Sequence, residues 1–228
     1  GVKRAVVGCI DRFAKVHGNG IRKLKDAGID VEVGVLEEEC KRLNECFFTF
    51  NTLRRPYILL KWCQTANGYL DDGYKPFRMS TPYTQMLVHK LRSEYDAILV
   101  GRVTAERDKP QLNVRLWHGK DPMRLVIDKE HPCFDGLDFS NSNDVPAQIA
   151  EWLYKQGMQS LMVEGGAKTL QGFIDAGLWD EIRVETVSVV VSGGTKAPHL
   201  DDELLAFADR KVYDRNIVDT FRRGDSRE

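Results

Sequence analysis

Leu161-Met162-Val163-Glu164-Gly165-Gly166-Ala167-Lys168-Thr169-Leu170-Gln171-Gly172 is the stretch that decides the fold of this chain. The apolar run that ends at Glu164 predicts a buried strand, and a helix is expected over Thr169–Ala176 with Gly177 as its C-terminal signal. Glycine has no Cβ, so backbone amides at Gly165-Gly166 could approach a phosphate closely at the positive end of that helix. Such a turn is more often only a tight connection, and it is not the GxGxxG fingerprint. Both interpretations stay open.

The chain on either side of this stretch repeats the same alternation of strands and helices. Ser80-Thr81-Pro82 is typical of a helix start, with an N-cap followed by proline in the first turn. Alternating elements of this kind predict an α/β protein with a mostly parallel central sheet. The expected strands are Tyr57–Cys63, Ala97–Gly101, Met123–Asp128 and Glu181–Val191, and the expected helices are Pro82–Arg92 and Val145–Gly157.

The first fifty residues form a separate short unit. A buried strand is predicted at Lys3–Ile10, a helix at Ile21–Ala27, a half-buried strand at Ile29–Val33 and a helix at Glu37–Phe50. This is too little for an independent domain, so residues 1–50 are interpreted as the back half of one. The polar, proline-ended connection at Asn51–Pro56 is the predicted boundary, and residues 55–222 form the second domain.

Composition restricts the classes of function. The chain has 228 residues, with 33 basic against 34 acidic ones, and a formal net charge of -1 argues against nucleic-acid binding driven by overall charge. There is no apolar run near 18 residues, so no membrane partner is predicted. Five cysteines without a CxxC pair fit a reducing cytosol, and we expect a cytoplasmic protein. The cysteines are Cys9, Cys40, Cys46, Cys63 and Cys133.

Several charged residues near predicted strand ends have two interpretations each. Glu164 is either a structural carboxylate, solvated or partnering a helix terminus, or a group at the ligand crevice that opens at the carboxyl edge of a parallel sheet. Lys61, on an apolar strand, must reach solvent or find an anion. The polar segment Gly101–Arg115 is either a surface loop or a binding loop, since arginines suit phosphate monoesters. The candidate arginines are Arg92, Arg102, Arg107 and Arg115.

Metal chemistry is not indicated by the sequence. No HxE is followed by PCxxC, so the zinc deaminase motif is absent from the sequence given. The five histidines are scattered without ligand spacing, and each is interpreted as a surface or core residue. Neither HExxH, GxSxG nor a Walker loop occurs. No metal site is therefore predicted in this chain.

An ordered set of short motifs resembles one known family. The chain resembles the bifunctional diaminohydroxyphosphoribosylaminopyrimidine deaminase / 5-amino-6-(5-phosphoribosylamino)uracil reductase family of riboflavin biosynthesis. Each motif is weak alone, but they follow the family order over most of residues 55–200. They include Arg55-Pro56-Tyr57, Leu60-Lys61, Asn67-Gly68, Ser80-Thr81-Pro82, Leu91-Arg92, Ala97–Gly101, Leu112–Arg115, Arg124–Asp128 and Val163–Gly166.

The resemblance extends to the first fifty residues, which look like the end of the family's deaminase domain. Val6-Val7-Gly8, Ala27-Gly28-Ile29 and Gly34-Val35-Leu36 carry this part of the match. It implies that zinc would belong only to a deaminase part absent from the sequence given. We therefore expect no deaminase activity from the chain as it stands.

The resemblance also implies a three-layer fold like that of dihydrofolate reductase, with NADPH as cofactor. Lys61 and Glu164 would be the catalytic residues, orienting the ribosyl hydroxyls or relaying a proton. Arg92, Leu112, Arg115 and Glu164 would contact a phosphorylated pyrimidine, the two arginines at its 5′-phosphate. The residues implied to contact NADPH are Cys63, Thr104, Asp108, Gly166, Ala167, Lys168, Thr169, Leu170, Gln171 and Gly172.

Two segments depart from the family pattern. The loop from Gly68 to Ser80 is short, with Arg78 where the family has an aromatic residue. The stretch from Asp128 to Asp138 is compressed where a further strand is expected.

The implied reaction is hydride transfer from NADPH to C1′ of an imine-like form of the ribosylamine, by a homo-oligomeric enzyme. One alternative is a dihydrofolate-reductase-like enzyme with another pterin or pyrimidine substrate. Another alternative is a non-catalytic nucleotide-binding module. Arg92 and Arg115 argue against it, because a protein that binds only the cofactor does not need a second phosphate-binding site. The reductase interpretation depends on one expectation, which is that the turn after Glu164 and the segment after Val100 face a shared cleft.

Overall fold

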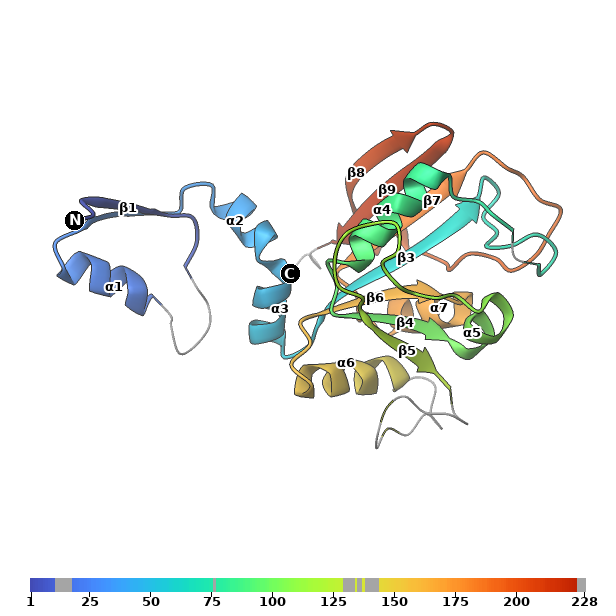
Figure 1. Ribbon diagram of the computed structural model, residues 1–228, viewed down its shortest axis with the longest axis horizontal. Coiled ribbons are helices and arrows are strands. Elements are labelled where there is room, and N and C mark those ends of the chain that lie inside the picture. Colours follow the sequence, from blue (N-terminus) through green and yellow to red (C-terminus); the bar gives the residue numbers. More distant parts are fainter. Residues whose placement is uncertain (11–17, 76, 129–133, 135–136, 138–143, 225–228) are drawn as a thin grey trace.

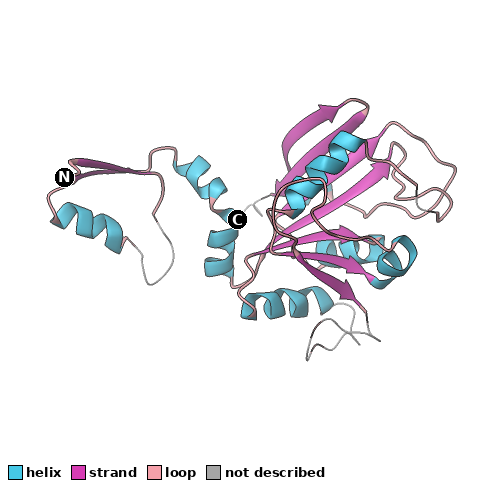
Figure 2. Cartoon of the chain, in the orientation of Figure 1, coloured by secondary structure: helices cyan, strands magenta, loops and turns pink. Residues whose placement is uncertain are grey.

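A seven-stranded sheet with helices on both faces dominates the structure, which is a computed structural model (Figures 1 and 2). It describes residues 1–10, 18–75, 77–128, 134, 137 and 144–224. The strand order is β5-β4-β6-β3-β7-β9-β8. The strands are β3 (Tyr57–Thr65), β4 (Ala97–Gly101), β5 (Met123–Ile127), β6 (Ser160–Gly165), β7 (Glu181–Val187), β8 (Leu205–Tyr213) and β9 (Asn216–Arg223).

The first five strands of that order are parallel, as the alternating pattern predicts. Crossover helices connect them, and parallel strands require such connections. The predicted helix over Pro82–Arg92 is confirmed, and the Thr81 Oγ1 N-cap accepts a hydrogen bond from the Thr84 N–H. The helices are α4 (Pro82–Arg92), α5 (Arg102–Asp108), α6 (Val145–Lys155), α7 (Ala167–Asp175) and a short 3₁₀ turn at Asp202–Leu204.

Alternate side chains of β3 pack into two separate cores, because successive residues of a strand point to opposite faces of the sheet. Ile58 and Leu60 pack with α6 and α7 on one face, whereas Leu59 packs with Leu91 of α4 on the other. Each of these residues is buried. The sheet is therefore the middle layer of a three-layer fold, and its carboxyl edge carries the loops that build the site.

The hairpin β8–β9 was not predicted, and the predicted strand Glu181–Val191 is too long. β7 ends at Val187, after which Val189 and Val190 are exposed. β9 pairs antiparallel with β7 and with β8. The sheet is therefore mostly but not wholly parallel. The further strand expected within Asp128–Asp138 falls largely outside the described residues.

The N-terminal elements form a small unit that is not buried. β1 (Arg4–Val7) and β2 (Asp30–Val33) pair in parallel, beside α1 (Asn19–Asp26). Neither strand contains a buried residue, so the predicted burial of β1 is wrong. The physical reason is that two strands and one helix provide too little structure to cover either face.

The predicted helix Glu37–Phe50 is two helices, α2 (Glu37–Leu43) and α3 (Glu45–Leu53), broken at Asn44. Leu43 is 85% exposed and does not share a packed face with the phenylalanines of α3. Instead Phe50 packs against Tyr154 of α6. Because α3 continues to Leu53, the connection between the two units is shorter than expected.

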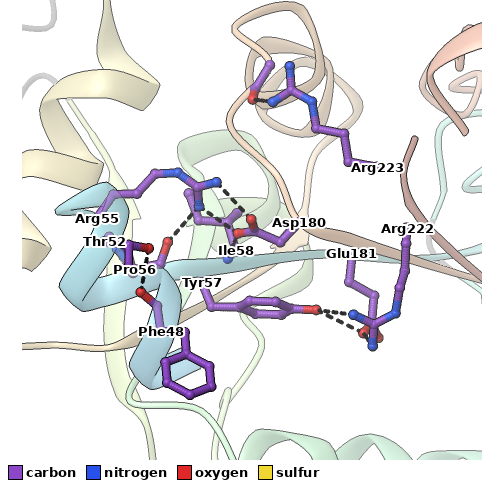
Figure 3. Close-up of polar contacts among 11 residues, drawn as sticks. Phe48, Thr52, Arg55, Pro56, Tyr57, Ile58, Asp180, Glu181, Arg222 and Arg223 are labelled. Atoms are coloured by element: carbon purple, nitrogen blue, oxygen red, sulfur yellow. Dashed lines mark hydrogen bonds and ion pairs between the residues drawn. The ribbon is translucent and has the colours of Figure 1, made fainter. Parts of the chain in front are cut away.

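Polar contacts fasten the start of β3 to the amino end of β7 and to β9 (Figure 3). Arg55 donates two hydrogen bonds to Asp180, at 2.6 and 2.7 Å. Arg222 of β9 bonds Glu45 of α3 and, at 3.3 Å, Glu181. These bonds set the amino ends of β3 and β7 side by side, at the edge opposite the site.

Candidate active site

The described chain contains a cleft of about 570 Å³ at the carboxyl edge of the sheet. In open parallel sheets this edge is where ligands bind. The cleft lies where β3, β4, β5 and β6 end, beside the starts of α5 and α7. Its lining is Lys61, Trp62, Cys63, Leu70, Met79, Arg92, Val100, Gly101, Arg102, Val103, Thr104, Arg107, Asp108, Pro110, Leu112, Ile127, Glu164, Gly165, Gly166, Ala167, Lys168, Thr169, Leu170 and Thr195.

Most of the predicted site residues meet in this cleft. The turn after Glu164 and the segment after Val100 both line it, so the expectation of a shared cleft is confirmed. The predicted residues among the lining are Lys61, Cys63, Arg92, Thr104, Asp108, Leu112, Glu164, Gly166, Ala167, Lys168, Thr169 and Leu170.

Three predicted residues are not brought into the cleft. The Arg115 side chain is exposed, and its Nη1 donates to Asn113 Oδ1 at 2.9 Å. Gln171 bonds the backbone of His199 at 2.8 Å, and Gly172 lies near Pro146 on the α6 side. Since α7 turns about 100° per residue, only the residues of its first turn face the cleft.

Glu164 joins two cations at the floor of the cleft. Its Oε2 accepts hydrogen bonds from Arg92 Nη2 at 2.6 Å and Nε at 3.0 Å. Lys61 Nζ lies 3.4 Å from Oε1. The three side chains are only 7 to 13% exposed. This resolves the interpretation of Glu164 and Lys61: they are partners in a buried cluster rather than solvated charges.

The glycines of this edge are required by the contact between two turns. A Cβ at Gly165 would lie 2.9 Å from Thr104 Cγ2, and one at Gly101 would lie 2.5 Å from Thr169 Oγ1. Gly166 has φ +80°, in the region that favours glycine. These short distances support the interpretation of Gly165-Gly166 as a tight connection between strand and helix. The same connection places the N-terminus of α7 at the cleft.

The segment after Val100 is a helix and not only a loop. α5 occupies Arg102–Asp108 and ends at Lys109, which has φ +43°. Gly101 precedes it without a side-chain cap. No cap and no glycine stop marks this helix in the sequence, which is why it was missed.

The remaining wall of the cleft was not predicted. Met79 and Leu70 come from the loop between β3 and α4, and Thr195 from the segment after β7. The buried Asp71 carboxylate accepts hydrogen bonds from Thr195 Oγ1 and from Arg107 Nη1, at 2.6 and 3.1 Å. No local pattern could reveal Thr195, because its partner lies 124 positions away.

Two titratable groups near the floor are kept neutral. Burial raises the pKa of the Cys63 thiol to about 12. Burial, together with Arg92 and Arg115, lowers the pKa of His89. The Cys63 thiol therefore stays protonated near neutral pH and is unsuited to nucleophilic chemistry.

Within the described ranges, no three His, Cys, Asp or Glu side chains are grouped as a metal site would need. In the same part of the chain, no helix combines the length and apolar character needed to cross a bilayer.

The sheet, its two helical layers and its edge cleft define a reductase fold of the dihydrofolate reductase type. The crystal structure of a diaminohydroxyphosphoribosylaminopyrimidine deaminase / 5-amino-6-(5-phosphoribosylamino)uracil reductase from Thermotoga maritima is similar, with a TM-score of 0.86 and 28% identity. The similarity covers 98% of this chain and 72% of that one. RibD from Acinetobacter baumannii shares the fold, with a TM-score of 0.80 and 23% identity.

The sequence model of the family called RibD C-terminal domain matches residues 56–214. The chain belongs to that family. The riboflavin biosynthesis protein RibD of Aquifex aeolicus is 35% identical over 227 residues, covering 85% of this chain. The chain spans 64% of the length of that relative. That residues 1–50 are part of a deaminase domain stays a prediction.

Proposed function

We propose that this chain uses NADPH to reduce the ribosyl group of 5-amino-6-(5-phosphoribosylamino)uracil to the ribitylamino product, in riboflavin biosynthesis. The observation that carries the proposal is the buried Lys61–Glu164–Arg92 cluster beside the glycine turn of α7, within one cleft. Family membership supports a reductase of this pathway. The fold supports it independently, since sheet edges of this type hold dinucleotides.

The cleft fits a nicotinamide dinucleotide. Its volume of about 570 Å³ lies within the usual range for small-ligand sites. The N-terminal turn of α7 offers backbone N–H groups and a positive dipole end to a diphosphate. Thr104 and Asp108 stand on α5 across from it, and Lys168 adds a cation. These residues would hold NADPH, which supplies a hydride when bound.

Glu164 and Lys61 are suited to orient the ribosyl group. Glu164 Oε1 accepts one long bond from Lys61, so it keeps capacity for a hydroxyl donor. Lys61 carries three N–H donors and can bond a sugar oxygen while it stays beside the carboxylate. The low exposure of both groups strengthens their electrostatic interaction with a bound substrate. We infer that orientation, with proton transfer at the ribosyl oxygens, is their role.

Arg92 is the proposed phosphate contact that the cleft contains. Its Nη1 also donates to the Asn113 carbonyl at 3.3 Å, so the guanidinium is fixed at two points. Arg115 would have to change rotamer to join it at the 5′-phosphate. We extend the proposal to a homo-oligomeric enzyme in the cytoplasm.

Turnover of the purified protein tests the proposal. With NADPH and the phosphorylated substrate, absorbance of the reduced nicotinamide should fall, and the dephosphorylated compound should be a poor substrate. Glu164→Gln keeps the shape but removes the charge, so kcat/KM should drop by about a hundredfold or more.

Glu151→Gln is the matched control, because Glu151 is an exposed residue of α6 that pairs with Lys155 away from the cleft. It should leave turnover unchanged. Full turnover by Glu164→Gln would remove Glu164 from the site, and no turnover by the wild-type protein would contradict the proposed function.

A further inference from the structure

Asp71 is a fully buried carboxylate that no part of the proposed reaction uses. Its exposed fraction is 0%. Oδ1 accepts hydrogen bonds from the backbone N–H groups of Thr195 at 2.8 Å and Tyr74 at 3.2 Å. Oδ2 accepts from Thr195 Oγ1 at 2.6 Å and Arg107 Nη1 at 3.1 Å. Four donors from three chain segments thus converge on one side chain.

Those segments form one side of the cleft. Thr195 lies in the segment after β7, and Arg107 is in the last turn of α5; both line the cleft. Arg107 Nε also donates to Asp108 Oδ1 at 3.0 Å. A chain of hydrogen bonds therefore runs from Asp71 through Arg107 to Asp108, which lines the cleft and is a proposed cofactor contact.

The surroundings of Asp71 are built for an ionised carboxylate. Burial alone would raise its pKa, but the hydrogen bonds from Thr195, Arg107 and Tyr74 hold that pKa below its usual value. Gly194 has φ +143°, and a Cβ there would lie 2.3 Å from Asp71 Oδ1. The backbone is therefore packed against the carboxylate so closely that only glycine fits.

We propose that Asp71 is a positioning residue for the cofactor: it fixes Thr195 directly, and Asp108 through Arg107, in the orientation that binds NADPH. It does not touch the reacting atoms, which the proposed function places beside Lys61 and Glu164. Side chains that contact a ligand need such support, since small displacements weaken binding strongly. The inference rests on the proposed function, because it takes NADPH as the ligand.

Replacing the Asp71 carboxylate distinguishes an effect on NADPH affinity from an effect on the rate of the chemical step. In Asp71→Asn the side-chain NH₂ cannot accept hydrogen bonds. Where it replaces Oδ2, Arg107 and the Thr195 hydroxyl lose their acceptor, and where it replaces Oδ1, the backbone N–H groups of Thr195 and Tyr74 lose theirs. The dissociation constant and the KM for NADPH should rise by about tenfold or more. The kcat at saturating NADPH should stay within about twofold, because the Lys61–Glu164–Arg92 cluster is unchanged. A general loss of folding would instead lower the active fraction, and so kcat.

The experiment titrates NADPH into the full chain by fluorescence and measures steady-state kinetics on the same samples. Asp72→Asn is the matched control, since the neighbouring Asp72 is exposed and should keep the wild-type affinity. Unchanged NADPH affinity in Asp71→Asn, with the wild type binding, would overturn the inference alone. Absence of NADPH binding by the wild-type protein would overturn the proposed function and this inference with it.

Three further variants keep the test decisive if Asp71→Asn does not fold. Arg107→Gln, at a side chain one-third exposed, should raise the dissociation constant in the same way. Thr195→Val should weaken binding, and Thr195→Ser, which keeps the hydroxyl donor, should restore it. Equal weakening by Val and Ser, or none by Arg107→Gln, would contradict the proposed role of Asp71.

Discussion

His89 lies outside the cleft lining and contacts the segment that follows α5. The imidazole is 3% exposed, and its Nδ1 accepts a hydrogen bond from the Arg115 N–H at 3.2 Å. His89 belongs to α4, as Arg92 does, and its ring contacts the segment after α5. Because burial and the two arginines lower its pKa, His89 is neutral in the folded protein at physiological pH.

Acid should therefore destabilise the protein through His89. Below the usual histidine pKa of about 6.5, the unfolded chain takes up a proton that the folded protein resists. The free energy of unfolding should thus fall as the pH drops from 7.5 to 5. His89→Asn can still accept the Arg115 bond but has no proton to gain, so it should lose less stability.

Urea unfolding of both proteins at the two pH values measures this difference. The wild-type midpoint should shift further toward low urea than that of the variant. Parallel shifts in the two proteins would show that His89 makes no contribution.

At the scale of elements, local patterns predicted the buried strands and the capped helix α4, but they missed α5 and the hairpin β8–β9. α4 and β4 carry caps or unbroken apolar runs, and their predicted bounds are those observed. The strand β8 has no buried residue and three adjacent charges, Asp209 to Lys211, so it shows no alternating pattern. α5 is short and uncapped. These elements are held by the partners they pair with, which a local pattern does not contain.

The contact between the turns that follow β4 and β6 yields a prediction for two glycines. In Gly165→Ala the new Cβ would press on Thr104, which should lower the free energy of unfolding by about 1 to 3 kcal/mol. Gly172→Ala, inside α7, would place its Cβ 3.9 Å from Pro146 and should stabilise the protein by up to about 1 kcal/mol.

Thermal unfolding of the two variants compares them directly. Thr104→Ser removes the Cγ2 methyl group, the atom nearest the new Cβ, and should partly rescue Gly165→Ala. If both glycine variants unfolded at the wild-type temperature, the close approach of the two turns would be refuted.

At the scale of the whole molecule, the sequence predicted the cleft because strand ends of a parallel sheet meet at one edge. That rule was enough to place the turn after Glu164 and the segment after Val100 at one cleft, whereas the family resemblance was needed to include Thr104 and Lys61 as site residues. The rule could not predict the contact between Asp71 and Thr195, because that contact joins two loops that lie 124 positions apart in the sequence. Nor could the rule predict the hydrogen bonds at the amino edge of the sheet, where Arg55 bonds Asp180, which lies 125 positions away in the sequence.

The central claim is that one cleft holds a nicotinamide dinucleotide between the turns after β4 and β6. Amide hydrogen exchange of the protein with and without NADPH, read by mass spectrometry of its peptides, tests it most directly. NADPH should slow exchange in residues 101–108 and 165–170 together and leave the hairpin β8–β9 unchanged. Protection confined to other segments, or to neither turn, would contradict the account.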